Sequence, residues 1–152
     1  MSCFETVGYG YSSILCEDIA SWFINKYVPR HKFYVRIVHK GLKREHSFGF
    51  CDFVDQAYRP RVFVIEVQSN LSKEMYIKTL LHEFVHLKQW LQGTLRMKSG
   101  KMYFDGESVE KYEYMDQPHE VEAYDSEERL AREFLCDTYG KEFAEKIVGE
   151  KL

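Results

Sequence analysis

The residues with the clearest chemical potential are two histidines and a glutamate, His82, Glu83 and His86, in the pattern HExxH. They lie in SKEMYIKTLLHEFVHLKQWLQG, which contains good helix formers, Ser72 as an N-cap and Gly93 as a stop signal. Histidines four positions apart share one face of a helix, so both imidazoles can reach one metal ion at about 2.0–2.1 Å. Glu83 is rotated by about 100° from His82, where its carboxylate can serve a metal-bound water. The pattern predicts a hydrolytic site with one zinc ion per chain.

A catalytic zinc site normally has a third protein ligand, and the segment PHEVEAY at 118–124 supplies candidates for it. Proline at the first position, acids early, arginines later and Gly140 at the end predict a second helix that starts near Pro118. Glu120 and Glu122 lie about 200° apart around such a helix. Only one of these two carboxylates can therefore face the metal.

These two segments resemble the gluzincin branch of the zincin metallopeptidases, particularly its minimal single-domain members. In that family a glutamate three positions before a small residue completes the site, which implies Glu120, three before Ala123, as the third ligand. His119 would take this role in a metzincin-like arrangement, but HEFVHLKQWLQG lacks the glycine and third histidine of the longer metzincin motif. The family's usual acidic partner, four positions after the ligand, is a tyrosine here. Asp125 or Glu127 is therefore expected to orient a histidine.

The resemblance implies a zinc metallopeptidase that hydrolyses peptide bonds in a protein or peptide substrate. Glu83 is the expected general base, which takes a proton from water and later delivers it to the leaving nitrogen. A tyrosine is expected to stabilise the oxyanion, and Tyr114 is preferred over Tyr112 and Tyr124 for that role.

The elements expected to position these residues belong to one α+β domain covering residues 1–152. Hydrophobic periodicity predicts a first helix from Ser12 or Ser13 to just before Pro29, and a hairpin that turns at Ser99–Gly100. It also predicts three strands, within 31–40, 46–54 and 61–68, that form a mainly antiparallel meander. A short final helix is predicted at 141–148. The resemblance places these elements in zincin-like order. It implies that the strand at 61–68, just before the HExxH helix, forms the cleft edge and pairs with extended substrate.

Composition is that of a soluble globular protein. The chain has 152 residues, of which 45% are hydrophobic and 30% charged, with a net charge of −3, and this argues against a disordered chain. No apolar run approaches the roughly 18 residues of a membrane span, and the start MSCFETVGYG lacks the pattern of a signal peptide. We therefore expect a cytoplasmic protein with no membrane partner. Its four cysteines stand singly, which favours free thiols over disulfides and excludes a CxxC zinc ribbon.

The charge distribution leaves a second hypothesis open. Seven cations and no acid lie in the segment 26–44, at Lys26, Arg30, Lys32, Arg36, Lys40, Lys43 and Arg44. Such a segment could contact phosphate in a nucleic-acid-associated module, either as an SprT-like protease or as a protein with a non-catalytic metal. Against the first version, SprT-like proteins often append a four-cysteine zinc ribbon, which this chain lacks. Otherwise the basic segment is a solvated face.

Overall fold

The computed structural model describes residues 3–42 and 48–148 of the chain. Its elements are, in order, β1 (Phe4–Gly8), α1 (Ser13–Tyr27), β2 (Tyr34–Lys40), β3 (Gly49–Phe53), β4 (Val62–Gln68), α2 (Lys73–Gln92), β5 (Leu95–Lys98), β6 (Lys101–Phe104), β7 (Glu107–Ser108), the 3-10 turn η1 (Tyr114–Asp116), α3 (Pro118–Tyr139) and α4 (Lys141–Val148). Two parts of the sequence-based predictions lie outside the described residues. They are the cations Lys43 and Arg44, and positions 46–47 of the second predicted strand.

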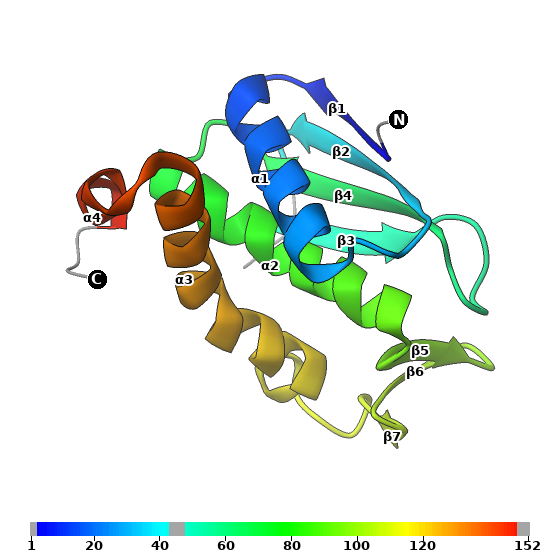
Figure 1. Ribbon diagram of the computed structural model, residues 1–152. Helices are drawn as coiled ribbons and strands as arrows, with labels where there is room; N and C mark the ends of the chain where they lie inside the picture. Colours follow the sequence, from blue (N-terminus) through cyan, green and yellow to red (C-terminus); the bar gives the residue numbers. More distant parts are fainter. Residues whose placement is uncertain (1–2, 43–47, 149–152) are drawn as a thin grey trace.

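The fold is α+β as predicted, but the prediction of a three-stranded antiparallel meander is wrong. The main sheet has four strands in the order β1-β2-β4-β3 (Figure 1). β1 pairs parallel with β2, and β2 pairs parallel with β4, whereas only β3 and β4 are antiparallel. The helix α1 connects β1 to β2, and such a crossover joins parallel strands. β1 was missed because five residues next to two glycines carry little periodic signal.

The predicted cleft-edge strand is also wrong. β4 matches the predicted strand at 61–68, but it lies inside the sheet between β2 and β3. Its residues pair with β2 from Val62 to Gln68 and with β3 from Phe63 to Val67. β3 is instead the outermost strand on this side of the sheet, among the strands of the described residues. Strand order depends on contacts between distant segments, which strand periodicity does not encode.

The helices pack on one face of the main sheet (Figure 1). Along β2 and β4, every second side chain points into the core, and those side chains are fully buried or nearly so. On the other face, charged side chains pair across strands, Arg36 with Glu5 and Lys40 with Glu66. One face of the sheet therefore holds the core against α1 and α2, while the other is less buried and carries these charged pairs.

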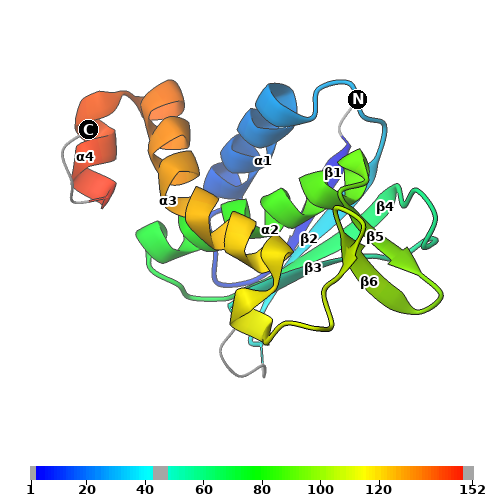
Figure 2. The same cartoon turned by 90° about the horizontal axis from the view of Figure 1, so that it is seen from below.

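The helix boundaries near the predicted site agree with the sequence. Ser72 caps α2 by accepting a hydrogen bond from the Met75 amide, and Gly93 ends it with a φ of 79°. α3 begins at Pro118 and ends at Gly140, as predicted. It runs beside α2 in both views and continues into α4 (Figures 1 and 2). This pairing brings the start of α3 next to the middle of α2.

The remaining predictions concern the hairpin and the cysteines. The predicted hairpin is present as β5 and β6, which turn at Ser99 and Gly100 with φ values of 52° and 77°. The four cysteines are free thiols, as predicted: Cys3, Cys16, Cys51 and Cys136. Within the described residues, no helix combines the length and the apolar character that crossing a bilayer requires.

Candidate metal centre

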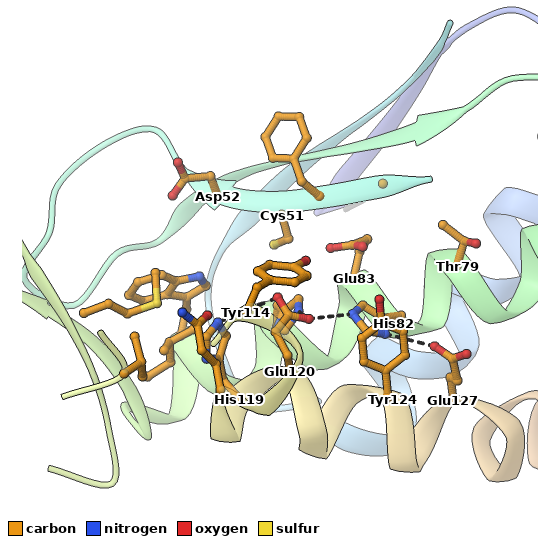
Figure 3. Close-up of a pocket in the computed structure, with 18 of the residues that line it drawn as sticks. Cys51, Asp52, Thr79, His82, Glu83, Tyr114, His119, Glu120, Tyr124 and Glu127 are labelled. Carbon is orange, nitrogen blue, oxygen red and sulfur yellow. Dashed lines mark hydrogen bonds and ion pairs between the residues drawn. The ribbon is translucent and has the colours of Figure 1, made fainter. Parts of the chain in front are cut away.

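His82 and His86 lie one turn apart on α2, and Glu120 faces them from the first turn of α3 (Figure 3). Nε2 of His82 lies 3.0 Å and Nε2 of His86 lies 3.1 Å from the same oxygen, Oε1 of Glu120. All three residues are buried, and their ligand atoms lie within 4.8 Å of one another. Both nitrogen–oxygen distances are shorter than twice a Zn–N bond of about 2.0–2.1 Å, so an ion could bridge Glu120 and either histidine. This group could hold a metal ion.

The second nitrogen of each histidine is held by a hydrogen-bond acceptor. His82 Nδ1–H donates to Glu127 Oε2 at 2.9 Å, because a carboxylate can only accept. His86 Nδ1 lies 2.8 Å from Gln89 Oε1. The amide nitrogen of Gln89 donates to the His119 carbonyl and to Glu122, so its oxygen must accept from His86 Nδ1–H. In the neutral tautomer of both histidines, the lone pair is therefore on Nε2, the atom that faces Glu120.

Comparison with models of known protein families, with curated proteins and with solved structures finds no match to this chain.

The charges of the group favour a cation between the two histidines and Glu120. Burial raises the pKa of Glu120, but hydrogen bonds from His82 and His86 outweigh it and hold the pKa well below its usual range. Burial lowers the pKa of His82, but hydrogen bonds to Glu120 and Glu127 outweigh it and raise the pKa to about 9. Glu120 therefore remains ionised, and the carboxylates around His82 stabilise positive charge. A donor set of two imidazole nitrogens and one carboxylate suits zinc and other divalent transition metals.

Glu83 lies beside the histidines but is not part of their hydrogen-bond group. Its side chain is buried, and its Oε1 atom has no hydrogen-bond partner within the described residues. Burial raises the pKa of Glu83 to about 7, although the nearby His86 and His82 lower it. The cause of the burial is β3, which crosses above this carboxylate (Figure 3). A Cβ atom added at Gly49 would lie 3.3 Å from Glu83 Cγ, and Cys51 follows on the same face of β3.

These residues line a cavity of about 920 Å³ between β3, α2, the β5–β6 hairpin and the start of α3. Tyr114 lines it, half exposed, and burial together with the charge of Glu120 raises the pKa of its phenol. Tyr124 also lines it and meets the ring of His82 edge-on, with ring centroids 4.5 Å apart. The structure thus places the predicted tyrosine Tyr114 and its alternative Tyr124 at the cavity. Tyr112 is not among the lining residues.

Of the alternatives for the third ligand, Glu120 is the one that faces the histidines. Glu122 instead accepts a hydrogen bond from the side-chain amide of Gln89 on α2. His119 is buried, with its Nε2 3.7 Å from Glu120 Oε2, and it lies outside the group of three ligand atoms. Burial and the neighbouring His86 lower the pKa of His119 to about 4, so it is neutral near pH 7.

The partners of the two histidines were predicted unequally well. Glu127 was one of two candidates, and it is the one bonded to His82, because it lies seven positions after Glu120 on the same face of α3. Gln89 was not predicted. A sequence signal existed, since Gln89 stands three positions after His86 and so faces the same side of α2.

Proposed function

We propose that this protein is a zinc-dependent metallopeptidase. The observation that carries the proposal is the convergence of His82 Nε2, His86 Nε2 and Glu120 Oε1, beside the buried Glu83, whose Oε1 atom has no hydrogen-bond partner among the residues that the structure describes. The three convergent residues would hold the ion, and a zinc ion bound there would act as a Lewis acid and make water a nucleophile near neutral pH. Three protein ligands leave a position open for water or substrate, as a catalytic rather than a structural site requires.

The chain's own contribution to the reaction centres on Glu83. A carboxyl group with a pKa near 7 can take a proton from an attacking water and later donate it to the leaving amine nitrogen. Since Oε1 of Glu83 makes no hydrogen bond with the described residues, it is available for that water. Tyr114 lines the cavity next to Glu120, so it is suited to donate a hydrogen bond to the developing oxyanion (Figure 3).

Substrate binding is assigned to β3 rather than to β4. β3 is the outermost strand of the sheet on the cavity side, and it lies above Glu83. An extended peptide added to this edge would run past the glutamate and the three ligand atoms. β3 also lines the cavity that contains Glu83 and the three candidate ligands, so a peptide paired with β3 would lie next to these groups.

Metal analysis and one substitution test the proposal. Purified protein should contain close to one zinc per chain, and His86→Ala should remove it. Glu83→Gln should keep the zinc but lower the rate of hydrolysis of an unfolded protein by about 10²–10⁴-fold. Glu74→Gln, which changes a partly exposed glutamate in the first turn of the same helix, is the matched control and should hydrolyse at the parent rate. A folded protein without bound zinc, or a fully active Glu83→Gln variant, would contradict the proposal.

The nucleic-acid hypothesis gains less support. Among the described cations of the segment 26–44, Lys26 pairs with Glu133 and Asp137, while Arg36 and Lys40 pair with acids on neighbouring strands. Cations neutralised in this way contribute less to an attraction for phosphate. The acidic partners of Lys26, Arg36 and Lys40 therefore favour peptide hydrolysis over nucleic-acid binding as the proposed function.

A further inference from the structure

One end of the cavity is apolar, and it lies beyond His86 in the direction of the carboxyl end of α2. Its walls, which we call the apolar compartment, are Trp90, Leu95, Met97, Met102 and Val109. Trp90, Leu95 and Val109 are buried, whereas the two methionines are partly exposed. Met97 and Met102 are direct cross-strand neighbours on the β5–β6 hairpin. The compartment therefore has a rigid base and two flexible side chains that can adapt to an apolar group.

The compartment lies about two residues of an extended peptide away from the candidate metal centre. Trp90 follows His86 by four residues, which is about 6 Å along a helix. In an extended peptide, side chains on the same face are about 6.8 Å apart. A peptide bound with one carbonyl at the metal ligands can thus place a neighbouring side chain in the compartment.

The direction of β3 indicates which side of the scissile bond this neighbour occupies. At the start of β3, Gly49 approaches Thr79 and Glu83, whereas at its end the Phe53 ring meets Trp90 with centroids 5.1 Å apart. β3 therefore runs from the reacting groups towards the compartment. Antiparallel pairing is the more stable way to add a strand. A peptide paired antiparallel to β3 has its amino-terminal residues at the Phe53 end.

We propose that the apolar compartment selects substrates with a bulky apolar residue, such as leucine, methionine or phenylalanine, on the amino-terminal side of the scissile bond. The proposal rests on the proposed peptidase function and deepens it by naming the substrate class. Met97 and Met102 are the specificity-determining residues. Because they are partly exposed, they can be replaced without opening a cavity in the core.

The test uses a peptide library and the variant Met97→Lys. The zinc-loaded parent should cleave peptides in which a bulky apolar residue is the first or the second residue on the amino-terminal side of the cleaved bond. Met97→Lys should lower kcat/KM for a leucine peptide by about 10–200-fold and favour an acidic residue at that position. Ile14→Lys is the control, since Ile14 is 71% exposed on α1 and outside the cavity, and its preferences should equal those of the parent. Cleavage without an apolar preference, a preference on the carboxyl side, or a preference unchanged by Met97→Lys would overturn the proposal.

A binding measurement separates this proposal from the proposed peptidase activity. Fluorescence anisotropy of labelled leucine and glutamate peptides should show tighter binding of the leucine peptide to Glu83→Gln. Adding Met97→Lys to Glu83→Gln should remove that difference. If the parent cleaves nothing but this difference in binding is present, the peptidase function fails and the apolar selectivity stands. If the parent cleaves but the two peptides bind Glu83→Gln equally, the selectivity fails and the peptidase function stands.

Discussion

The two halves of α3 both carry acidic clusters, but the clusters meet different partners. In the first half, Glu120 and Glu127 face the histidines of α2. In the second half, Glu133 accepts from Arg129 at 2.7 Å and from the Tyr27 hydroxyl, and it pairs with Lys26. We call Glu120 and Glu127 with their partners His82 and His86 the histidine cluster. Glu133 with its partners Lys26, Tyr27 and Arg129 is the cation cluster.

The difference between the clusters lies in the charge and exposure of the partners. Lys26 and Arg129 carry permanent charge at neutral pH, so the negative charge of Glu133 is already compensated. His82 and His86 can be neutral, and their Nε2 lone pairs then face Glu120. The side chain of Glu120 is 8% exposed, whereas the side chain of Glu133 is 30% exposed. One helix thus presents a carboxylate whose partners can give up a proton and bind metal, and another whose partners keep their charge.

The largest expected effect is on metal affinity. Glu120→Gln removes the negatively charged member of the three candidate ligands. A four-ligand structural zinc site supplies roughly 10–16 kcal/mol of binding free energy, so the loss of one ligand should weaken zinc binding by about 1000-fold. Glu133→Gln should leave the affinity unchanged. The measurement is a zinc titration against a competing chelator of known affinity. Equal losses in both variants would mean that the two clusters do not differ in metal binding.

A smaller effect is expected for the residues that orient the histidines. Glu127→Gln removes the carboxylate that accepts from His82, and Gln89→Ala removes the amide that accepts from His86. Each should weaken zinc binding by about 10–100-fold. Glu128→Gln, which changes an exposed partner of Arg132 on the same helix, is the control and should bind zinc like the parent. Unchanged affinity in the Glu127 and Gln89 variants would show that neither residue orients its histidine.

Sequence reasoning succeeded where the relevant spacing is local. The pair His82 and His86 follows from helical periodicity alone. The rotation between Glu120 and Glu122 indicates that only one of them can face the histidines, whereas the preference for Glu120 comes from the family resemblance. The helix caps at Ser72 and Gly93 are likewise encoded within a few residues. These features depend on residues less than two helical turns apart.

The missed features depend on contacts between distant segments. The burial of Glu83 comes from Gly49 and Cys51, more than thirty positions away, once β3 becomes an edge strand. Nothing in the alternation of β3 or β4 reveals which of the two is outermost. The parallel pairing of β1 with β2 depends in turn on how α1 packs between them. The sequence therefore predicted the candidate ligand group better than the walls of the cavity around it.

The cation cluster should contribute modestly to stability. Lys26 lies 3.3 Å from Glu133 and joins α1 to α3, but both side chains are partly exposed. Removing this pair should lower the free energy of unfolding by about 1 kcal/mol or less. A double-mutant cycle with Lys26→Met and Glu133→Gln, followed by urea denaturation in the presence of zinc, measures the coupling. A coupling free energy above about 3 kcal/mol would instead be typical of a buried ion pair and would contradict this prediction.

The smallest expected effect is a difference in pH dependence, measured on protein from which metal has been removed. Burial raises the pKa of Glu133, but Tyr27, Arg129 and Lys26 outweigh it and hold the pKa below its usual range. Its stabilising contribution is therefore complete above the unfolded pKa of about 4.3 and is lost as the pH falls through the lower folded value. The stability difference between the parent and Glu133→Gln should shrink below about pH 4.

The contribution of the histidine cluster to stability should also fall at alkaline pH, whereas that of the cation cluster should not. The pKa of His82 is raised to about 9, so its contribution is complete below its unfolded pKa of about 6.5 and is lost as the pH rises through about 9. The stability difference between the parent and Glu120→Gln should therefore decline across this interval, while that for Glu133→Gln stays constant because Lys26 and Arg129 remain charged. Urea midpoints of the metal-free proteins between about pH 6 and 9.5 measure both differences. Parallel curves for the two variants would mean that the charge on His82 does not distinguish the two halves of α3.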